Sequence, residues 1–349
     1  MDTPDGANAR IEDRSAPRRS TPFGQRALAL VLGAFLAVLS HAGQSVPQVG
    51  IVFNSVRMAD VTGAVPRNDC ARAMVEGLRE QGWVDGRNVR LHWRSAEDRH
   101  DRRPALIEEL ARLPVDVLFV GTNDAVSEAL SLAKGIPIVA NGMQNILENG
   151  WAKSLSRPGG NLTGLSHLAS DEIYGKRLAL LKQAAPRVTA VAFLTTISAY
   201  ERIEFPDAAR IGVRVFKQDV RYPGQIEAAV DEAARKGANG LLFDDATVFL
   251  QGENMVTASR AAERHRLPAI FTYAGSSDSG GMMTYSEDIV ARCRRSAHYI
   301  HRILRGTKPG DIPIELPSKH DLVFNLRAAR AIGVEIPQSL LMQADRVID

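Results

Sequence analysis

Short apolar runs alternate with segments of helical periodicity along most of the chain, and this alternation is the feature that most constrains the fold. Val49–Ser55 is rich in β-branched residues and precedes Asp69–Gln81, where apolar residues recur at helical spacing. The same order recurs in Val115–Thr122 and Asp124–Lys134. Continuous apolar strands joined by helices are typical of a parallel sheet that is covered on both faces. The sequence therefore predicts an α/β fold.

The alternation starts again after Arg157–Gly164, a stretch rich in turn-forming residues. Two α/β halves pack most simply as two Rossmann-like lobes, each with a parallel sheet, with a ligand cleft between them. We expect residues 43–164 with about 286–312 to form one lobe and residues 165–285 the other, and the pattern leaves the lobe of residues 313–349 open. The expected strands are Val49–Ser55, Val89–Trp93, Val115–Thr122, Ile136–Asn141, Thr189–Thr195, Val213–Val220, Asn239–Asp244, Pro268–Tyr273 and Gly281–Ser286, and the expected helices are Asp69–Gln81, Arg103–Leu113, Asp124–Lys134, Asp171–Ala184, Gly224–Lys236, Glu253–Arg266, Ile289–Arg305 and Leu326–Ile332.

The N-terminal region has the features of a secretory signal peptide. Basic residues up to Arg26 precede the uncharged apolar run Ala27–Leu39, and Ser40–Ala42 offers small residues for cleavage. A helix of that length spans about 20 Å, short of the roughly 30 Å hydrocarbon core of a bilayer, so a cleaved leader is favoured over a membrane helix. The run contains no polar positions at helical spacing, which argues against a buried N-terminal helix. Because no cysteine follows the run, we expect a leader over about residues 1–42 and a freely soluble periplasmic protein rather than a lipoprotein.

Charge and cysteine content exclude several other classes of protein. Lys and Arg together number 43 and Asp and Glu 40, which leaves a net charge of +3. Such a balance lacks the basic surface that nucleic-acid binding requires, so no nucleic-acid partner is expected. Cys70 and Cys293 lie far apart in the sequence, and neither has a second cysteine or a ligand set at zinc spacing nearby. No metal and no cofactor are therefore expected, and the sequence leaves open whether the two thiols pair or are simply packed.

The common catalytic motifs are missing from the sequence. It contains no GxxxxGK[ST], GxSxG or HExxH motif, and no GxGxxG between a strand and a helix. His298 and His301 lie three residues apart, but the arginines around them would repel a metal cation, so a solvated basic face is favoured. The basic run Arg99–Arg103 likewise predicts a solvated loop. We expect no catalytic residues and favour a binding protein over an enzyme.

Candidate ligand-binding residues lie where the expected strands end, because open α/β sheets bind ligands at that edge. Thr122 and Asn123 precede an expected helix, whose first N–H groups are free to hold a carboxylate, and the alternative that they only cap this helix stays open. The candidates from the first half are Asn54, Ser55, Thr122, Asn123, Gln144 and Asn145.

Asp245 and Tyr273 are the candidates from the second half. Asp245 follows Asp244 at the end of an expected buried strand, where it can meet a ligand or cap a turn. Tyr273 can offer a ring face and a hydroxyl group to a ligand, and packing in the core is its alternative.

Several longer segments resemble one family, the substrate-binding proteins of bacterial ABC transporters. The resemblance covers nearly the whole chain from Val49 onward. It rests on GIVFNS from Gly50, EGLREQGWVDGRNV from Glu76, VDVLFVGT from Val115, IPIV from Ile136, SLSRPGGNLTGLS from Ser154, HRLPAIF from His265, GGMMTYS from Gly280 and DLVFNLRAARAIGVEIPQSLLMQADRVI from Asp321.

The resemblance implies a type I periplasmic-binding-protein fold and a role in solute transport. The protein would capture a small solute such as an amino acid or an aromatic acid by closure of its lobes, and deliver it, as a monomer, to an ABC importer permease in the inner membrane. Many relatives carry an Asp for a ligand amine where this sequence has Asn145, and this departure weakens an amino-acid assignment. A ligand sensor for a membrane receptor and an enzyme that uses Asp244 or Asp245 as an acid or base are the alternatives, and the solute is left open.

Overall fold

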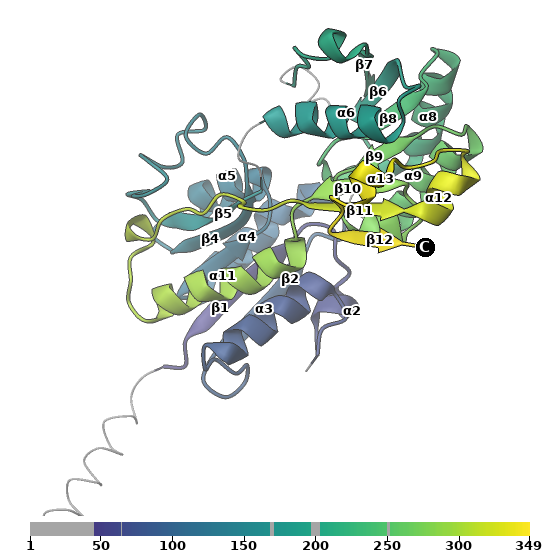
Figure 1. Ribbon diagram of the computed structural model, residues 1–349. Helices are drawn as coiled ribbons and strands as arrows, with labels where there is room; N and C mark the ends of the chain where they lie inside the picture. Colours follow the sequence, from purple (N-terminus) through teal and green to yellow (C-terminus); the bar gives the residue numbers. More distant parts are fainter. Residues whose placement is uncertain (1–44, 64, 168–170, 197–202, 250–251) are drawn as a thin grey trace, which may run out of the picture. The chain divides into compact units, whose positions relative to one another are not determined.

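The computed structural model describes residues 45–63, 65–167, 171–196, 203–249 and 252–349 (Figure 1). By its contacts the chain divides into a short unit, Met1–Val46, and a large unit, Pro47–Asp349, which holds all the elements discussed below. The predicted leader lies outside the described residues. Among the residues that are described, no helix is long and apolar enough to cross a membrane.

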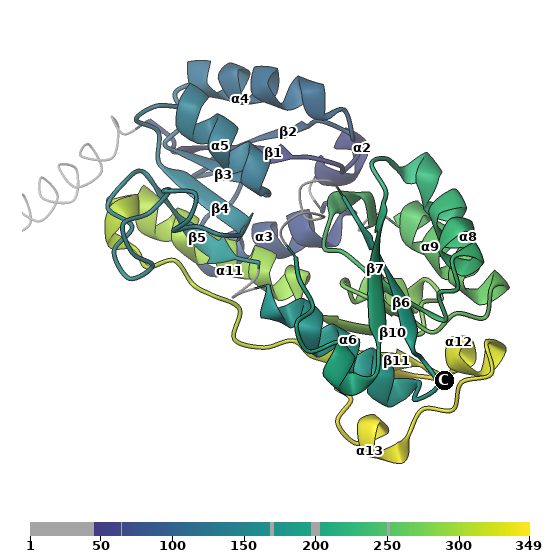
Figure 2. The same cartoon turned by 90° about the horizontal axis from the view of Figure 1, so that it is seen from above.

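The first sheet has five parallel strands in the order β2-β1-β3-β4-β5. Its strands are β1 (Gln48–Phe53), β2 (Arg90–Ser95), β3 (Val117–Val120), β4 (Ile138–Met143) and β5 (Leu162–Ser166). Its helices are α2 (Met58–Val61), α3 (Asp69–Glu80), α4 (Arg103–Arg112), α5 (Asn123–Leu132) and α11 (Ile289–Leu304). Helices α3 and α11 pack on one face of the sheet and α4 and α5 on the other, as Figure 2 shows.

Helix α3 illustrates how the sequence forms these elements. The Asn68 side chain accepts a hydrogen bond from the Ala71 amide at 3.0 Å and so caps the first turn. Met74 and Leu78 lie one turn apart on the same side, and both are buried in the core beneath the sheet. Burial of this apolar stripe, rather than helix propensity, supplies most of the stability of such a helix.

The second sheet has seven strands in the order β12-β11-β10-β9-β8-β6-β7. All neighbours are parallel except β10 and β11. Its strands are β6 (Ala190–Thr195), β7 (Arg214–Asp219), β8 (Gly240–Phe243), β9 (Ala269–Phe271), β10 (Met283–Ser286), β11 (Asp321–Asn325) and β12 (Arg346–Ile348). Its helices are α6 (Glu172–Ala184), α8 (Ile226–Arg235), α9 (Gly252–Arg264), α10 (Gly275–Asp278), α12 (Leu326–Ala331) and α13 (Gln338–Leu341). Helix α6 contributes to the core on one face, and α8 contributes to the core on the other.

The chain passes between the two sheets three times. It leaves the first sheet after β5, returns after β10 to form α11, and crosses again between Glu315, which bridges to Leu165, and β11. Residues of the last segment, whose lobe the sequence left open, supply β11 and β12 to the second sheet. Two sheets with three connections are thus present.

Strand β5 differs from the expectation for Arg157–Gly164: the stretch is rich in turn-forming residues, yet its last three residues begin a buried strand. Gly164 lies against β4 with φ of +134°, and a Cβ atom there would be 2.0 Å from the Ala140 carbonyl oxygen. In the sequence Gly164 indicates a turn, but in the structure a glycine is required there because two backbones of the sheet approach closely.

Candidate functional site

The ends of β1 and β3 bring two predicted residues into contact. These strands are parallel neighbours, so the residues that follow them, Asn54 and Thr122, lie at the same edge of the sheet. The Asn54 Nδ2 atom donates a hydrogen bond to Thr122 Oγ1 at 2.8 Å. The same Thr122 oxygen accepts from the Ala125 amide at 3.4 Å and so caps α5. Thr122 is therefore both a helix cap and part of the polar edge.

Asn123 joins the loop after β3 to the loop after β4. Its Oδ1 atom accepts from the Gln144 amide at 2.8 Å, and its Nδ2 atom donates to the Gln144 carbonyl at 3.3 Å. Asn145, which follows Gln144, has a φ of +51°. This is a left-handed conformation that Asn tolerates better than most residues. Ser55 is half-buried, and its Oγ atom has no hydrogen-bond partner within the described part of the chain. The structure thus joins four of the six predicted residues of the first half in two pairs, Asn54 with Thr122 and Asn123 with Gln144, and we call these four the polar edge.

Arg103 supports this edge, and sequence reasoning missed it. Its side chain is only 4% exposed, and it donates to both carboxylate oxygens of Glu128 at 2.7 Å and to Asn54 Oδ1 at 3.4 Å. The expectation that Arg99–Arg103 forms a solvated loop is therefore wrong for Arg103. A buried guanidinium requires a carboxylate partner, and Glu128 lies on another helix, so the local sequence gave no sign of the pair.

Asp244 and Asp245 are buried at the end of β8, and protein groups contact both carboxylates. Asp244 accepts hydrogen bonds at 2.8 Å from the hydroxyl groups of Tyr174 and Thr195. Burial raises the pKa of Asp244, and the neighbouring carboxylate of Asp245 raises it further. Asp245 Oδ2 lies 2.6 Å from Arg177 Nη1. Burial alone would raise the pKa of Asp245, but Arg177 and the nearby His167 hold it below its usual value.

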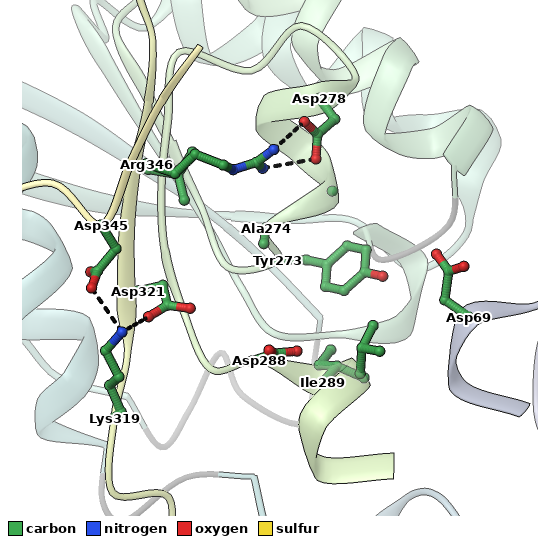
Figure 3. A pocket seen from close by; sticks show the side chains of 13 residues that line it. Asp69, Tyr273, Ala274, Asp278, Asp288, Ile289, Lys319, Asp321, Asp345 and Arg346 are labelled. Atoms are coloured by element: carbon green, nitrogen blue, oxygen red, sulfur yellow. Dashed lines mark hydrogen bonds and ion pairs between the residues drawn. The ribbon is translucent and has the colours of Figure 1, made fainter. Parts of the chain in front are cut away.

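Tyr273 lines a cavity of about 490 Å³, within the range of small-molecule sites. Figure 3 shows the Tyr273 hydroxyl pointing toward Asp69. Asp69 and Asp288 begin α3 and α11 of the first sheet, whereas Tyr273 follows β9 of the second, so both halves of the chain contribute to this cavity. The residues that line it are Asp69, Tyr273, Ala274, Gly275, Asp278, Asp288, Ile289, Val290, Lys319, Asp321, Val323, Asp345 and Arg346. Tyr273 is the one predicted site residue among them.

The charge around Tyr273 is negative. The two basic groups in the lining are already paired, Lys319 with Asp321 and Asp345, and Arg346 with Asp278. Burial raises the pKa of Tyr273, and the carboxylates of Asp69 and Asp288 raise it further. A neutral phenol beside carboxylates favours a ligand that carries an ammonium group and an apolar or aromatic portion.

A disulfide bond between Cys70 and Cys293 joins α3 to α11, and the first residues of both helices line this cavity. Cys70 directly follows Asp69, so the bond fixes the position of the first turn of α3. The two cysteines lie 223 residues apart, which is why spacing alone left their pairing open. Among the described residues, no group of three His, Cys, Asp or Glu side chains is placed to hold a metal ion.

Residues 66–348 match the model of a family described as ABC transporter substrate binding protein. A tyrosine-binding protein of Clostridioides difficile (strain R20291) is 21% identical over 269 residues, which is 76% of each chain. A domain from Streptococcus pneumonia, solved in complex with L-Trp, is 20% identical with a TM-score of 0.76, over 87% of this chain and 100% of that one. The ligand-free, open structure of a Clostridium difficile substrate binding protein with adhesive properties is 19% identical with a TM-score of 0.63, over 87% and 99%. The likeness to the solved structures shows the two-lobed α/β fold of the type I periplasmic binding proteins.

Proposed function

Because the chain belongs to the family of ABC transporter substrate-binding proteins, we propose that the small solute it binds is an amino acid with an aromatic side chain. The family consists of binding proteins rather than enzymes, so the solute is held and released without reaction. The observation that carries the proposal is the cavity at Tyr273, which combines an aromatic ring with the carboxylates of Asp69 and Asp288. The relatives that bind tyrosine and L-Trp support the same solute class.

The cavity provides carboxylates that the polar edge of the first sheet lacks. The family resemblance implied an Asp for a ligand amine at the place where this chain has the neutral Asn145. Asp69 and Asp288 lie beside Tyr273 instead, on helices held by the disulfide bond. We assign the solute ammonium group to these two carboxylates. The first N–H groups of α5, at the polar edge around Asn54, Thr122 and Asn123, are a second candidate contact for an anionic group of the solute.

A panel of solutes tests this proposal by thermal shift of the mature protein. We expect L-tyrosine or L-tryptophan to raise the melting temperature saturably, and sugars and nucleosides to leave it unchanged. Tyr273→Ala should lower the apparent affinity derived from the thermal shift at least tenfold. This corresponds to a loss of about 1.4 kcal/mol or more in binding free energy. Tyr222→Ala removes an exposed tyrosine elsewhere on the second sheet and serves as the matched control. A shift with a sugar but none with any aromatic amino acid would show the solute class to be wrong.

Delivery to a permease requires export, and the leader over residues 1–42 is the proposed signal. The disulfide bond supports this location, because such bonds persist in the periplasm and are rare in the cytosol. Intact-mass measurement of protein recovered from the periplasm tests the proposal. A mature chain that begins near Gly43 is expected, and a chain that still begins at Met1 would contradict it.

A further inference from the structure

Five charged or titratable side chains form a buried cluster where the chain crosses between the two sheets. We call it the crossover cluster, and its members are His167, Arg177, Asp245, Glu287 and Arg292. His167 follows β5 and Glu287 follows β10, so each lies on one connection between the sheets. Arg292 belongs to α11, which packs on the first sheet, whereas Arg177 and Asp245 belong to the second. The cluster therefore joins elements of both halves.

The members are in direct contact and almost fully buried. Arg177 Nη1 lies 2.6 Å from Asp245 Oδ2, and Arg292 Nη1 donates to Glu287 Oε2 at 2.5 Å. The five side chains are between 1% and 11% exposed. Charges at this depth contribute favourably only when they are paired in a defined geometry. A change in the protonation of one member must therefore alter the contacts of the others.

His167 lies at the centre of the cluster and has more partners than it can satisfy at once. Its Nδ1 atom lies 2.9 Å from Arg292 Nη1 and 3.4 Å from Glu287 Oε2. When Nδ1 is unprotonated it accepts from Arg292, and when it is protonated it must donate to Glu287 instead. Its Nε2 atom lies 3.3 Å from Asp245 Oδ1 without an aligned hydrogen bond, and neither atom has another hydrogen-bond partner in the described part of the chain.

We propose that His167 is a positioning residue whose protonation exchanges a contact with α11 of the first sheet for tighter contacts with Glu287 and Asp245, and thereby changes the resting separation of the two lobes. Protonation would place two positive groups, the His167 ring and the Arg292 guanidinium, 2.9 Å apart, so that contact has to lengthen. Asp245, by contrast, gains a full ion pair. If the proposed solute is held between the lobes, its affinity depends on pH through the same equilibrium.

Within the described part of the chain, charged groups from several elements affect the titration of His167. Burial is the largest single effect and opposes protonation of the ring, but Asp245 and Glu287 favour it and outweigh burial and Arg292, so the pKa of His167 lies above its usual value. On the side of the second sheet, Arg177 fixes Asp245, and Tyr174 and Asp244 lie beyond it. His320, which stacks on Tyr285 with ring centroids 5.3 Å apart, is a second imidazole close enough to interact with His167. Burial and then Arg177 lower its pKa, so the two histidines titrate in different ranges.

The test is small-angle X-ray scattering of the unliganded mature protein between pH 5.5 and 8.5. We expect the radius of gyration to change with a midpoint above about 6.5, the ordinary value for histidine. His167→Gln should abolish this transition, while His100→Gln, which changes an exposed histidine elsewhere, should leave it intact. His320→Gln should also retain it. A radius that is independent of pH in the natural protein, or a transition that persists in His167→Gln, would overturn the proposal.

A second variant covers the case in which His167→Gln does not fold. Glu287→Gln keeps the shape of the side chain but removes one of the charges that favour protonation, so the midpoint should fall by about one pH unit. An unchanged midpoint would contradict the role assigned to Nδ1. Because no solute is added, these results do not depend on the identity of the solute, and failure of the proposed solute class would leave them unaffected.

Discussion

At the scale of single residues, the polar edge of the first sheet depends on contacts that the sequence predicts in part. Asn54 and Thr122 could be singled out because both follow apolar strands, and the structure places them 2.8 Å apart between Nδ2 and Oγ1. Arg103 and His167 could not be identified from the sequence, because their partners lie on other elements and only packing brings them together. Strand-end rules therefore identify an edge of a sheet but not the buried charges that support it.

Thr122→Ala removes two hydrogen bonds at once, one from Asn54 and one from the first turn of α5. We expect a loss of about 1 kcal/mol in the free energy of unfolding, together with weaker solute binding. Urea denaturation measures the first effect and calorimetry the second.

Thr62→Ala is the control for this prediction. Its exposed hydroxyl donates to the Met58 carbonyl, so its loss should change stability by less than about 0.5 kcal/mol. Equal losses in the two variants would show that Thr122 does not hold the polar edge together.

At the scale of elements, the alternation of strands and helices is predictable because each strand is a continuous apolar run with turn residues at its ends. Strand β5 is the exception. It begins within RPGGNLTG, whose glycines and proline indicate turns, yet Leu162 and Thr163 are fully buried in the sheet. The turn propensity of these residues is overridden here because β5 pairs along β4. Only a glycine at position 164 allows the two backbones to approach this closely at Ala140.

Gly164→Ala should therefore be among the most damaging small substitutions in the chain. The added Cβ would lie 2.0 Å from the Ala140 carbonyl oxygen, at a φ that side chains rarely adopt. We expect a loss of at least about 3 kcal/mol, measured by urea denaturation, or failure to fold.

Gly160→Ala is the matched control, because a Cβ atom there meets nothing within 4 Å. It should be close to neutral. If Gly164→Ala were as stable as this control, the pairing of β5 with β4 would be wrong.

At the scale of the whole molecule, the sequence predicts two α/β halves, and the structure adds how the last segment completes them. Strand β11 runs antiparallel to β10 and parallel to β12, an arrangement that periodicity cannot distinguish from a parallel edge. The cavity at Tyr273 also could not be predicted from the sequence, because Asp69 and Asp288 come from one half of the fold and Tyr273 comes from the other. Contacts between halves depend on the assembled fold rather than on any local pattern.

An aromatic amino acid that binds, unaltered, between elements of both sheets is the central proposal. A crystal structure of the mature protein grown with L-tryptophan tests this claim most directly. We predict an intact amino acid whose ring lies against Tyr273 and whose ammonium group contacts Asp69 or Asp288. Density for the amino acid at a site that involves only one sheet, or for a chemically altered product, would contradict this proposal.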